Sequence, residues 1–231
     1  MESFAKVAQS ISPCTLERAI FCQEEADVSD KERHAYQKQA AEDWETILIN
    51  RAREMKTGAH LIIGLMGLKD ANEFRRPNSG GTPAYLRVLR DIWWSNVEQG
   101  VITKEEFKNT NAAYYRRSEV ELKAPFVSKD SKVLKEGLKL ISIKMKDVPI
   151  NPAAMVGKDK VTGTRSIKRY VNSVQAWSNA IFYSGLSEHR SEEERKVIMD
   201  QLYSQFEECI MCNPDDFIFE FTMAYVDIVK T

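Results

Sequence analysis

The chain has 231 residues, of which 43% are hydrophobic, and its formal net charge is −1 at pH 7. This length suits one large domain, or one domain with an insertion, and the near-neutral charge gives no reason to expect a nucleic-acid partner, since such proteins usually carry a basic excess. The longest apolar run is too short to span a bilayer and no charged-then-apolar leader opens the sequence, so we expect a cytoplasmic protein without membrane contact.

Four cysteines are present, and two of them, Cys209 and Cys212, form a C-x-x-C pattern. Such a pair can bind a metal ion or undergo redox chemistry when it lies at a turn. Here Cys209 lies in a helical pattern, and the spacing of Cys14 and Cys22 is wrong for a second pair of zinc ligands. We therefore expect free thiols and no metal site.

The first predicted elements are a long helix and a strand. Ser29 followed by Glu32 predicts a capping box, and apolar residues at helical spacing then continue to about Met55. Residues 61–66 are apolar without interruption. A strand buried on both faces has this pattern, so we expect it within a parallel sheet that helices cover on both sides.

A polar, turn-rich loop follows at residues 71–83. Helical patterns resume over residues 84–98, and Thr103 with Glu106 predicts a second capping box at the start of a short helix. Residues 118–123 predict one or two further helical turns, which end before Pro125.

The last third of the chain predicts two strands and two helices. Residues 138–143 alternate in hydrophobicity and predict a strand. Residues 165–183 are helical, and Ser191 with Glu194 predicts the cap of the next helix. Residues 217–226 alternate over a long stretch, which predicts a final strand, commonly antiparallel to an otherwise parallel sheet.

Several segments, taken in order, resemble the SABATH methyltransferases. Residues 39–55, followed by Gly58 and the apolar strand, are similar to a family helix that carries a glutamine, an aspartate, a leucine, an arginine and a glutamate before the fifth strand of the sheet. The other matching segments are residues 98–102 with Glu105 and Glu106, residues 111–115 with Glu119 and Val120, residues 174–177, and the last strand with Lys230.

The resemblance implies an α/β fold, namely a partial Rossmann-like class I methyltransferase sheet that lacks its N-terminal strands and carries an α-helical cap. The implied domains are a Rossmann-like core at residues 1–70, with the crossover helix and the central strand, and a helical cap at residues 71–130. Residues 131–231 would supply the remaining core strands and helices together with part of the cap.

The implied activity is transfer of a methyl group from S-adenosylmethionine to a carboxylate, or to a ring nitrogen, of a small molecule. Such a reaction needs alignment and removal of water more than a general base. We therefore assign no catalytic residue and expect an apolar, aromatic-lined pocket under the cap.

The resemblance also implies binding residues, each of which ordinary core packing could equally explain. Substrate contacts are implied for Gln9, Tyr85, Leu86, Tyr115, Val174, Trp177 and Phe219, with Phe221 as the alternative to Phe219. The opening segment is similar to the family's substrate-carboxylate segment but lacks its histidine and tryptophan, which leaves Gln9 as a hydrogen-bond donor. Ser3 and Phe4 of the same segment are the implied cofactor contacts.

The cofactor-binding segments of the family, a glycine loop and two acidic strand ends, find no counterpart in this sequence. Three interpretations remain open. The chain is a piece of an active enzyme, or it is a degenerate, non-catalytic homologue that serves as an interaction module, or it belongs to a different Rossmann-like enzyme with the same half-sheet. Since a half-sheet exposes an edge and apolar faces, a homodimer or another obligate partner is expected.

Overall fold

The computed structural model describes residues 20, 21, 23, 25, 28–69, 83–112, 114–150 and 160–231. The chain divides into two compact units, each built from three stretches of sequence. We call residues 1–32, 77–113 and 150–219 the helical unit, and residues 33–76, 114–149 and 220–231 the sheet unit. The predicted boundaries at residues 70 and 130 stay a prediction.

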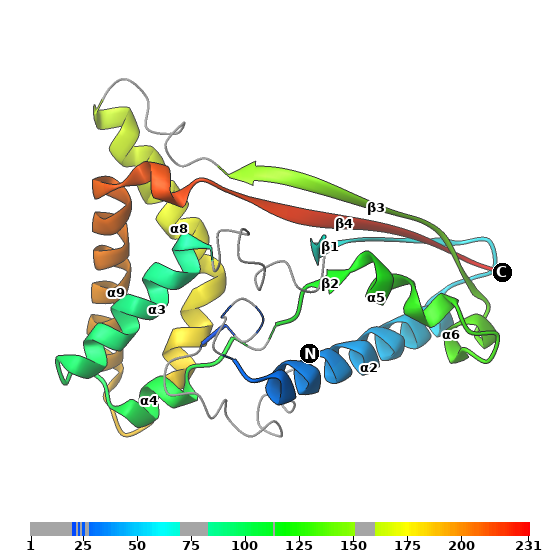
Figure 1. Ribbon diagram of the computed structural model, residues 1–231, viewed down its shortest axis with the longest axis horizontal. Coiled ribbons are helices and arrows are strands. Elements are labelled where there is room, and N and C mark those ends of the chain that lie inside the picture. The colour runs from blue at the N-terminus through cyan, green and yellow to red at the C-terminus, as the bar shows by residue number, and fades with distance from the viewer. Residues whose placement is uncertain are drawn as a thin grey trace. The chain divides into compact units, whose positions relative to one another are not determined.

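The sheet unit contains four strands in the order β2-β1-β4-β3 (Figure 1). Strand β1 pairs in parallel with β2 and antiparallel with β4, with His60 opposite Val229 and Gly67 opposite Thr222. The elements of this unit are α2 (Asp30–Glu54), β1 (His60–Leu68), β2 (Arg117–Ser118), α5 (Glu119–Lys123), η2 (Ala124–Phe126), α6 (Lys132–Lys135), β3 (Leu138–Ile150) and β4 (Phe219–Lys230).

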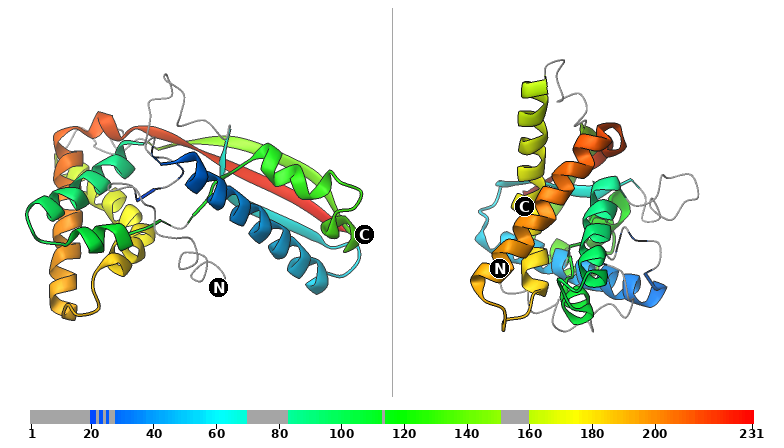
Figure 2. Two further views of the ribbon diagram at one scale, coloured as in Figure 1. Left: turned by 60° about the horizontal axis from the view of Figure 1, so that its bottom comes forward. Right: turned by 90° about the vertical axis from the view of Figure 1, so that its left-hand side faces the viewer.

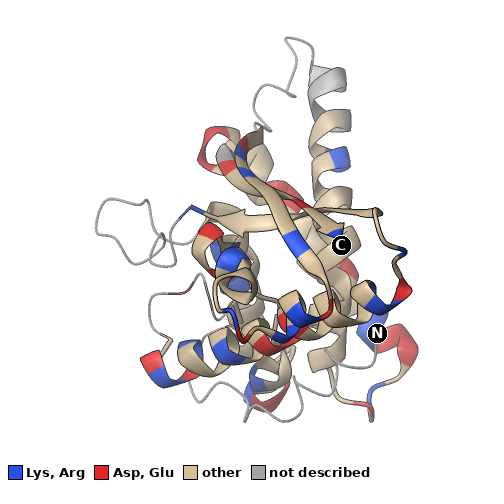
Figure 3. Cartoon of the chain, turned by 90° about the vertical axis from the view of Figure 1, so that its right-hand side faces the viewer, with Lys and Arg blue, Asp and Glu red and all other residues tan. Residues whose placement is uncertain are grey.

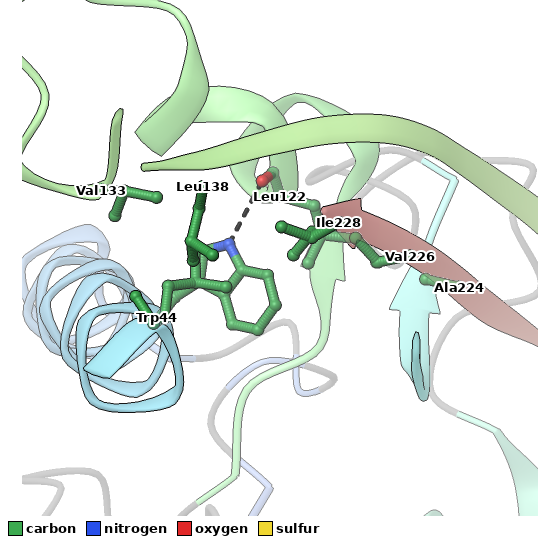
Figure 4. Packing of buried hydrophobic residues seen from close by; sticks show 9 residues of the cluster. Trp44, Leu122, Val133, Leu138, Ala224, Val226 and Ile228 are labelled. Carbon is green, nitrogen blue, oxygen red and sulfur yellow. Dashed lines mark hydrogen bonds between the residues drawn. The ribbon is translucent and has the colours of Figure 1, made fainter. Parts of the chain in front are cut away.

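Helices α2, α5 and α6 supply the residues that cover one face of this sheet (Figure 4). Trp44 lies at the centre of the core, and its Nε1 donates a hydrogen bond to the carbonyl oxygen of Leu122 at 3.2 Å. The other buried members of the core are Leu48, Ala52, Val133, Leu138, Ala224, Val226 and Ile228. The predicted amphipathic helix is thus confirmed as α2, which packs on the sheet through its apolar face.

The prediction that residues 61–66 are buried on both faces is wrong. In β1, Leu61, Ile63 and Leu65 are half-buried and pack on the core, whereas Ile62 is 67% exposed and Met66 is 44% exposed. The strand does lie inside the sheet, between β2 and β4. An uninterrupted apolar run predicts a strand, but it carries no information on which of its two faces has a covering helix.

The described elements of the helical unit are α3 (Ala84–Glu98), α4 (Lys104–Asn109), α8 (Lys160–Gly185), α9 (Glu192–Cys212) and η3 (Pro214–Phe217). Helix α9 packs against α8 and α3, and α4 packs against α8; Figure 2 shows these helices from two further sides. The predicted capping boxes are present at α4, from Thr103 and Glu106, and at α9, from Ser191 and Glu194. The third predicted box, Ser29 with Glu32, is present before α2.

Lys and Arg are interspersed with Asp and Glu over the elements seen in Figure 3, in agreement with the net charge of −1. Within the residues that the structure describes, no helix combines the length and hydropathy needed to cross a membrane.

Candidate functional site

Aromatic side chains from α3, α8 and the segment before α2 meet in the helical unit. The Trp177 ring lies edge-on to the Tyr85 ring, with 6.3 Å between centroids, and edge-on to the Phe21 ring at 6.5 Å. Phe182 contacts both Phe21 and Trp93. We call Phe21, Tyr85, Trp93, Trp177 and Phe182 the aromatic layer. Edge-to-face pairs at these distances hold the rings in fixed orientations.

Two members of the substrate-binding prediction, Tyr85 and Trp177, are therefore in contact with each other. Tyr85 is 7% exposed, but Trp177 remains 40% exposed. An indole that is held by neighbouring rings and still partly exposed offers apolar surface on which a ring-bearing ligand can pack.

Val174 and Leu86 are more deeply buried than Trp177. Val174 lies three residues before Trp177 on α8 and is 4% exposed, and Leu86 is fully buried. Their burial agrees with ordinary core packing, which was the alternative interpretation for each position. Their role as pocket residues stays a prediction.

Tyr115 belongs to the sheet unit, where its hydroxyl group donates a hydrogen bond to Glu121 Oε1 at 2.6 Å. Gln37 Nε2 donates to the same oxygen at 3.0 Å, and Glu121 also closes the capping box of α5 with Ser118. Burial alone would raise the pKa of Glu121, but the hydrogen bonds from Tyr115, Ser118 and Gln37 outweigh it, and the net pKa is lowered. A charged Glu121 thus fixes the orientation of Tyr115.

The remaining predicted binding residues are outside what the structure describes. Ser3, Phe4 and Gln9 lie outside the described residues, and the side chain of Phe219, the first residue of β4, is not described. Phe221, its alternative, is half-buried in the same strand. The proposed cofactor contacts and the proposed carboxylate contact therefore stay predictions.

The sequence analysis missed Tyr170, which lies on α8 one turn before Val174. Tyr170 is 6% exposed, its ring contacts Phe206 at 6.4 Å, and its hydroxyl group has no hydrogen-bond partner in the described part of the chain. Burial, together with the nearby Tyr85 phenol, raises the pKa of Tyr170. Its spacing of four from Val174 and seven from Trp177 was the signal available in the sequence, because such residues share one helix face.

A separate cavity of about 410 Å³ lies between α3 and α9. Six of its eight lining residues are polar: the lining is Asn96, Gln99, Val101, Val197, Asp200, Gln201, Ser204 and Gln205. None of these residues belongs to the binding prediction. Cys209 and Cys212 are free thiols near the end of α9.

The mixed sheet and the helices of this chain make an α/β fold. Among the solved structures that match is a chain described as loganic acid methyltransferase with SAH, with a TM-score of 0.64 and 18% sequence identity. The match covers 98% of this chain and 57% of that chain, so this chain spans a little over half the length of the other protein. A search of curated proteins found no match.

A sequence model of the family described as SAM-dependent carboxyl methyltransferase matches residues 6–223. The chain therefore belongs to the S-adenosylmethionine-dependent carboxyl methyltransferase family. The resemblance to the SABATH enzymes is confirmed, and the matched range includes most of the helical unit and most of the sheet unit.

Proposed function

We propose that this chain binds the methyl acceptor in an S-adenosylmethionine-dependent methyltransferase that acts on a small molecule with a carboxylate or a ring nitrogen. The observation that carries this proposal is the family match over residues 6–223. Trp177 supports it, because this ring is 40% exposed and is held by contacts with Tyr85 and Phe21, so that it provides exposed apolar surface in the helical unit.

S-adenosylmethionine, when bound, supplies a methyl group on a positively charged sulfur atom. Transfer to a carboxylate forms an oxygen–carbon bond and breaks the carbon–sulfur bond, whose electron pair remains on sulfur. Since a carboxylate is already an anion at neutral pH, no side chain has to remove a proton from such an acceptor first. The protein's task is to align the acceptor and to exclude water, for which aromatic and aliphatic walls are suited.

The proposal extends to the setting of the enzyme. The helical unit would act as the cap, the protein would be cytoplasmic, and it would form a homodimer. The free thiols of Cys209 and Cys212 suit a reducing compartment. The exposed apolar residues Ile62, Met66 and Tyr225 give a dimer a surface to cover.

Calorimetric titration tests the proposal. We expect saturable binding of S-adenosylhomocysteine and, in its presence, binding of small aromatic carboxylates. Trp177→Ala should weaken carboxylate binding about tenfold or more and leave the cofactor affinity unchanged, because in this proposal the ring contacts the acceptor and not the cofactor.

The matched control is Trp94→Ala, which removes a half-buried tryptophan of the same unit that contacts Phe107 and lies outside the aromatic layer. This variant should bind carboxylates like the unmodified protein. A folded chain that binds neither S-adenosylhomocysteine nor any carboxylate would overturn the proposal and favour the non-catalytic interaction module.

A further inference from the structure

The polar cavity between α3 and α9 lies within the helical unit and shares no residue with the aromatic layer. Its volume of about 410 Å³ falls in the range of roughly 300–1,000 Å³ that is typical of small-molecule sites. One of its lining residues, Asn96, is 2% exposed, and its Nδ2 has no hydrogen-bond partner among the described residues. Because nearly all buried polar groups in native proteins are paired, an unpaired amide in the wall of a cavity indicates a site for a hydrogen-bonding ligand.

Helix α9 contributes four polar residues to the same cavity, namely Asp200, Gln201, Ser204 and Gln205. Their spacing places them on one face of the helix. None of these side chains forms a hydrogen bond or an ion pair with another residue in the part of the chain that the structure describes. Three of them are exposed and Gln205 is half-buried, so a ligand can reach their donors and acceptors from solvent.

The composition of the lining excludes two classes of ligand. It contains no lysine, arginine, histidine or aromatic residue, and Asp200 is its one charged group. An anion would therefore meet a like charge and no cation, which rules out the carboxylate acceptor of the proposed function. An aromatic ligand would find no ring on which to stack.

The remaining residues fit a ligand rich in hydroxyl groups. Asn96, Gln99, Gln201 and Gln205 carry carboxamides and Ser204 carries a hydroxyl group, so each can donate as well as accept a hydrogen bond. A hydroxyl group of a ligand has the same two capacities, and Asp200 can accept from two hydroxyl groups at once. Two apolar residues, Val101 and Val197, are available for the carbon–hydrogen face of such a ligand.

We propose that the cavity lined by Asn96, Asp200 and Gln201 is a second ligand site, which binds a neutral polyhydroxylated molecule such as a sugar. The site is distinct from that of the methyl acceptor, and its existence does not depend on the proposed function.

NMR titration of the chain with glucose, galactose and their uronates tests the proposal. Glucose or galactose should bind saturably with a millimolar Kd. The matching uronate, which has the same ring with an added carboxylate, should bind about threefold more weakly because of Asp200. Asp200→Asn should remove this difference, and saturating benzoate should leave sugar binding unchanged.

Two variants locate the bound sugar. Gln201→Ala should weaken its binding roughly three- to tenfold, the range expected of one neutral hydrogen bond, and the fold should tolerate alanine at this exposed helical position. Asn96→Leu, which replaces the amide with an apolar group of similar size, should weaken it by a similar factor. Lys196→Ala is the matched control, because this exposed residue of α9 lies outside the lining, and it should bind the sugar like the unmodified protein.

The proposal is overturned if neither glucose nor galactose binds saturably, since water alone would then occupy the cavity. Unchanged affinity in Gln201→Ala also contradicts it, even if Asn96→Leu is too unstable to measure. Displacement of the sugar by benzoate would place both ligands in one site and contradict a second one. Sugar binding in a chain that binds neither S-adenosylhomocysteine nor any carboxylate would contradict the proposed function alone.

Discussion

One buried carboxylate, Glu106, joins the start of α4 to the loop between α8 and α9. Its Oε1 accepts hydrogen bonds from Arg190 Nε at 2.5 Å and from the Ser187 backbone at 2.9 Å. Its Oε2 accepts from Arg190 Nη2 and from the Thr103 backbone, both at 2.8 Å. The Arg190 hydrogen bond is the main reason that the pKa of Glu106 falls from 4.5 to about 2, and the backbone donors reinforce it against the cost of burial.

This lowered pKa predicts a pH dependence of stability. Because the folded-state pKa lies below the unfolded value, Glu106 stabilises the fold above pH 4.5, and this contribution is lost as the pH falls toward 2. Glu106→Gln should cost about 3 kcal/mol at neutral pH, since it leaves Arg190 without its carboxylate. The variant should also show a shallower loss of stability than the unmodified protein between pH 4.5 and 2.

Urea unfolding at a series of pH values measures both effects. The control is Glu105→Gln, which removes an exposed acidic residue from the same helix and should change stability by less than about 0.5 kcal/mol. Equal losses in the two variants would show that net charge, and not the Arg190 contact, is responsible.

At the scale of the elements, Gly185 determines how closely α8 and α4 approach. A Cβ atom at this position would lie 2.0 Å from Thr110 Oγ1 and 2.9 Å from the Glu106 carbonyl oxygen. The Thr110 hydroxyl cannot rotate away freely, because it accepts a hydrogen bond from Trp93 Nε1 at 2.9 Å and donates one to the Glu106 carbonyl. The contact between the two helices therefore has no room for a methyl group.

Gly185→Ala should accordingly destabilise the protein by about 1–3 kcal/mol through overpacking. Gly64→Ala is the control, because its Cβ would meet only the Tyr225 ring at 3.9 Å, an ordinary contact distance. Chemical denaturation midpoints compare the two. A Gly185→Ala variant as stable as Gly64→Ala would mean that α8 and α4 can separate at little cost.

The features that the sequence predicted best are those determined by neighbouring residues. The three capping boxes, from Ser29, Thr103 and Ser191 with their glutamates, require only a spacing of three and are all present. Strand β2, two residues long, has no pattern of its own and exists only because Arg117 and Ser118 lie beside Gly67 and Leu68. Its pairing depends on tertiary structure, so no local signal predicted it.

The same distinction applies to the candidate site. The resemblance singled out Tyr85 and Trp177, which are in contact, from positions far apart in the sequence. It did not single out Tyr170, because a tyrosine on an apolar helix face is typical of a core position until its hydroxyl group is known to lack a partner. Hydrogen-bond satisfaction can be assessed only from coordinates.

At the scale of the whole molecule, one face of the sheet presents apolar side chains to solvent. Ile62 and Met66 of β1 lie on this face together with Tyr225 of β4, which pairs with Gly64 between them. Clustered exposed apolar residues commonly mark an interface, whereas isolated ones need no explanation.

Ile62→Lys should therefore weaken self-association of the chain by at least about tenfold. The fold should tolerate it, because Ile62 lies opposite Asp227 and the new lysine gains an opposite charge across the strands. Sedimentation velocity measures the effect. Val120→Lys, at a position 78% exposed on α5, is the control and should leave association unchanged. An unmodified chain that is monomeric at high concentration would contradict the homodimer.

The pairing of β1 with β4 also has a consequence for synthesis. His60 and Asp227, whose side chains lie 2.8 Å apart, are separated by 167 positions in the sequence. During synthesis β1 leaves the ribosome long before β4. The edge of β1 that later pairs with β4 therefore has no hydrogen-bond partner while the intervening helices are made. Such non-local pairing is slow and prone to aggregation. Chaperone supply during translation should therefore limit the yield of this protein more than its final thermodynamic stability does.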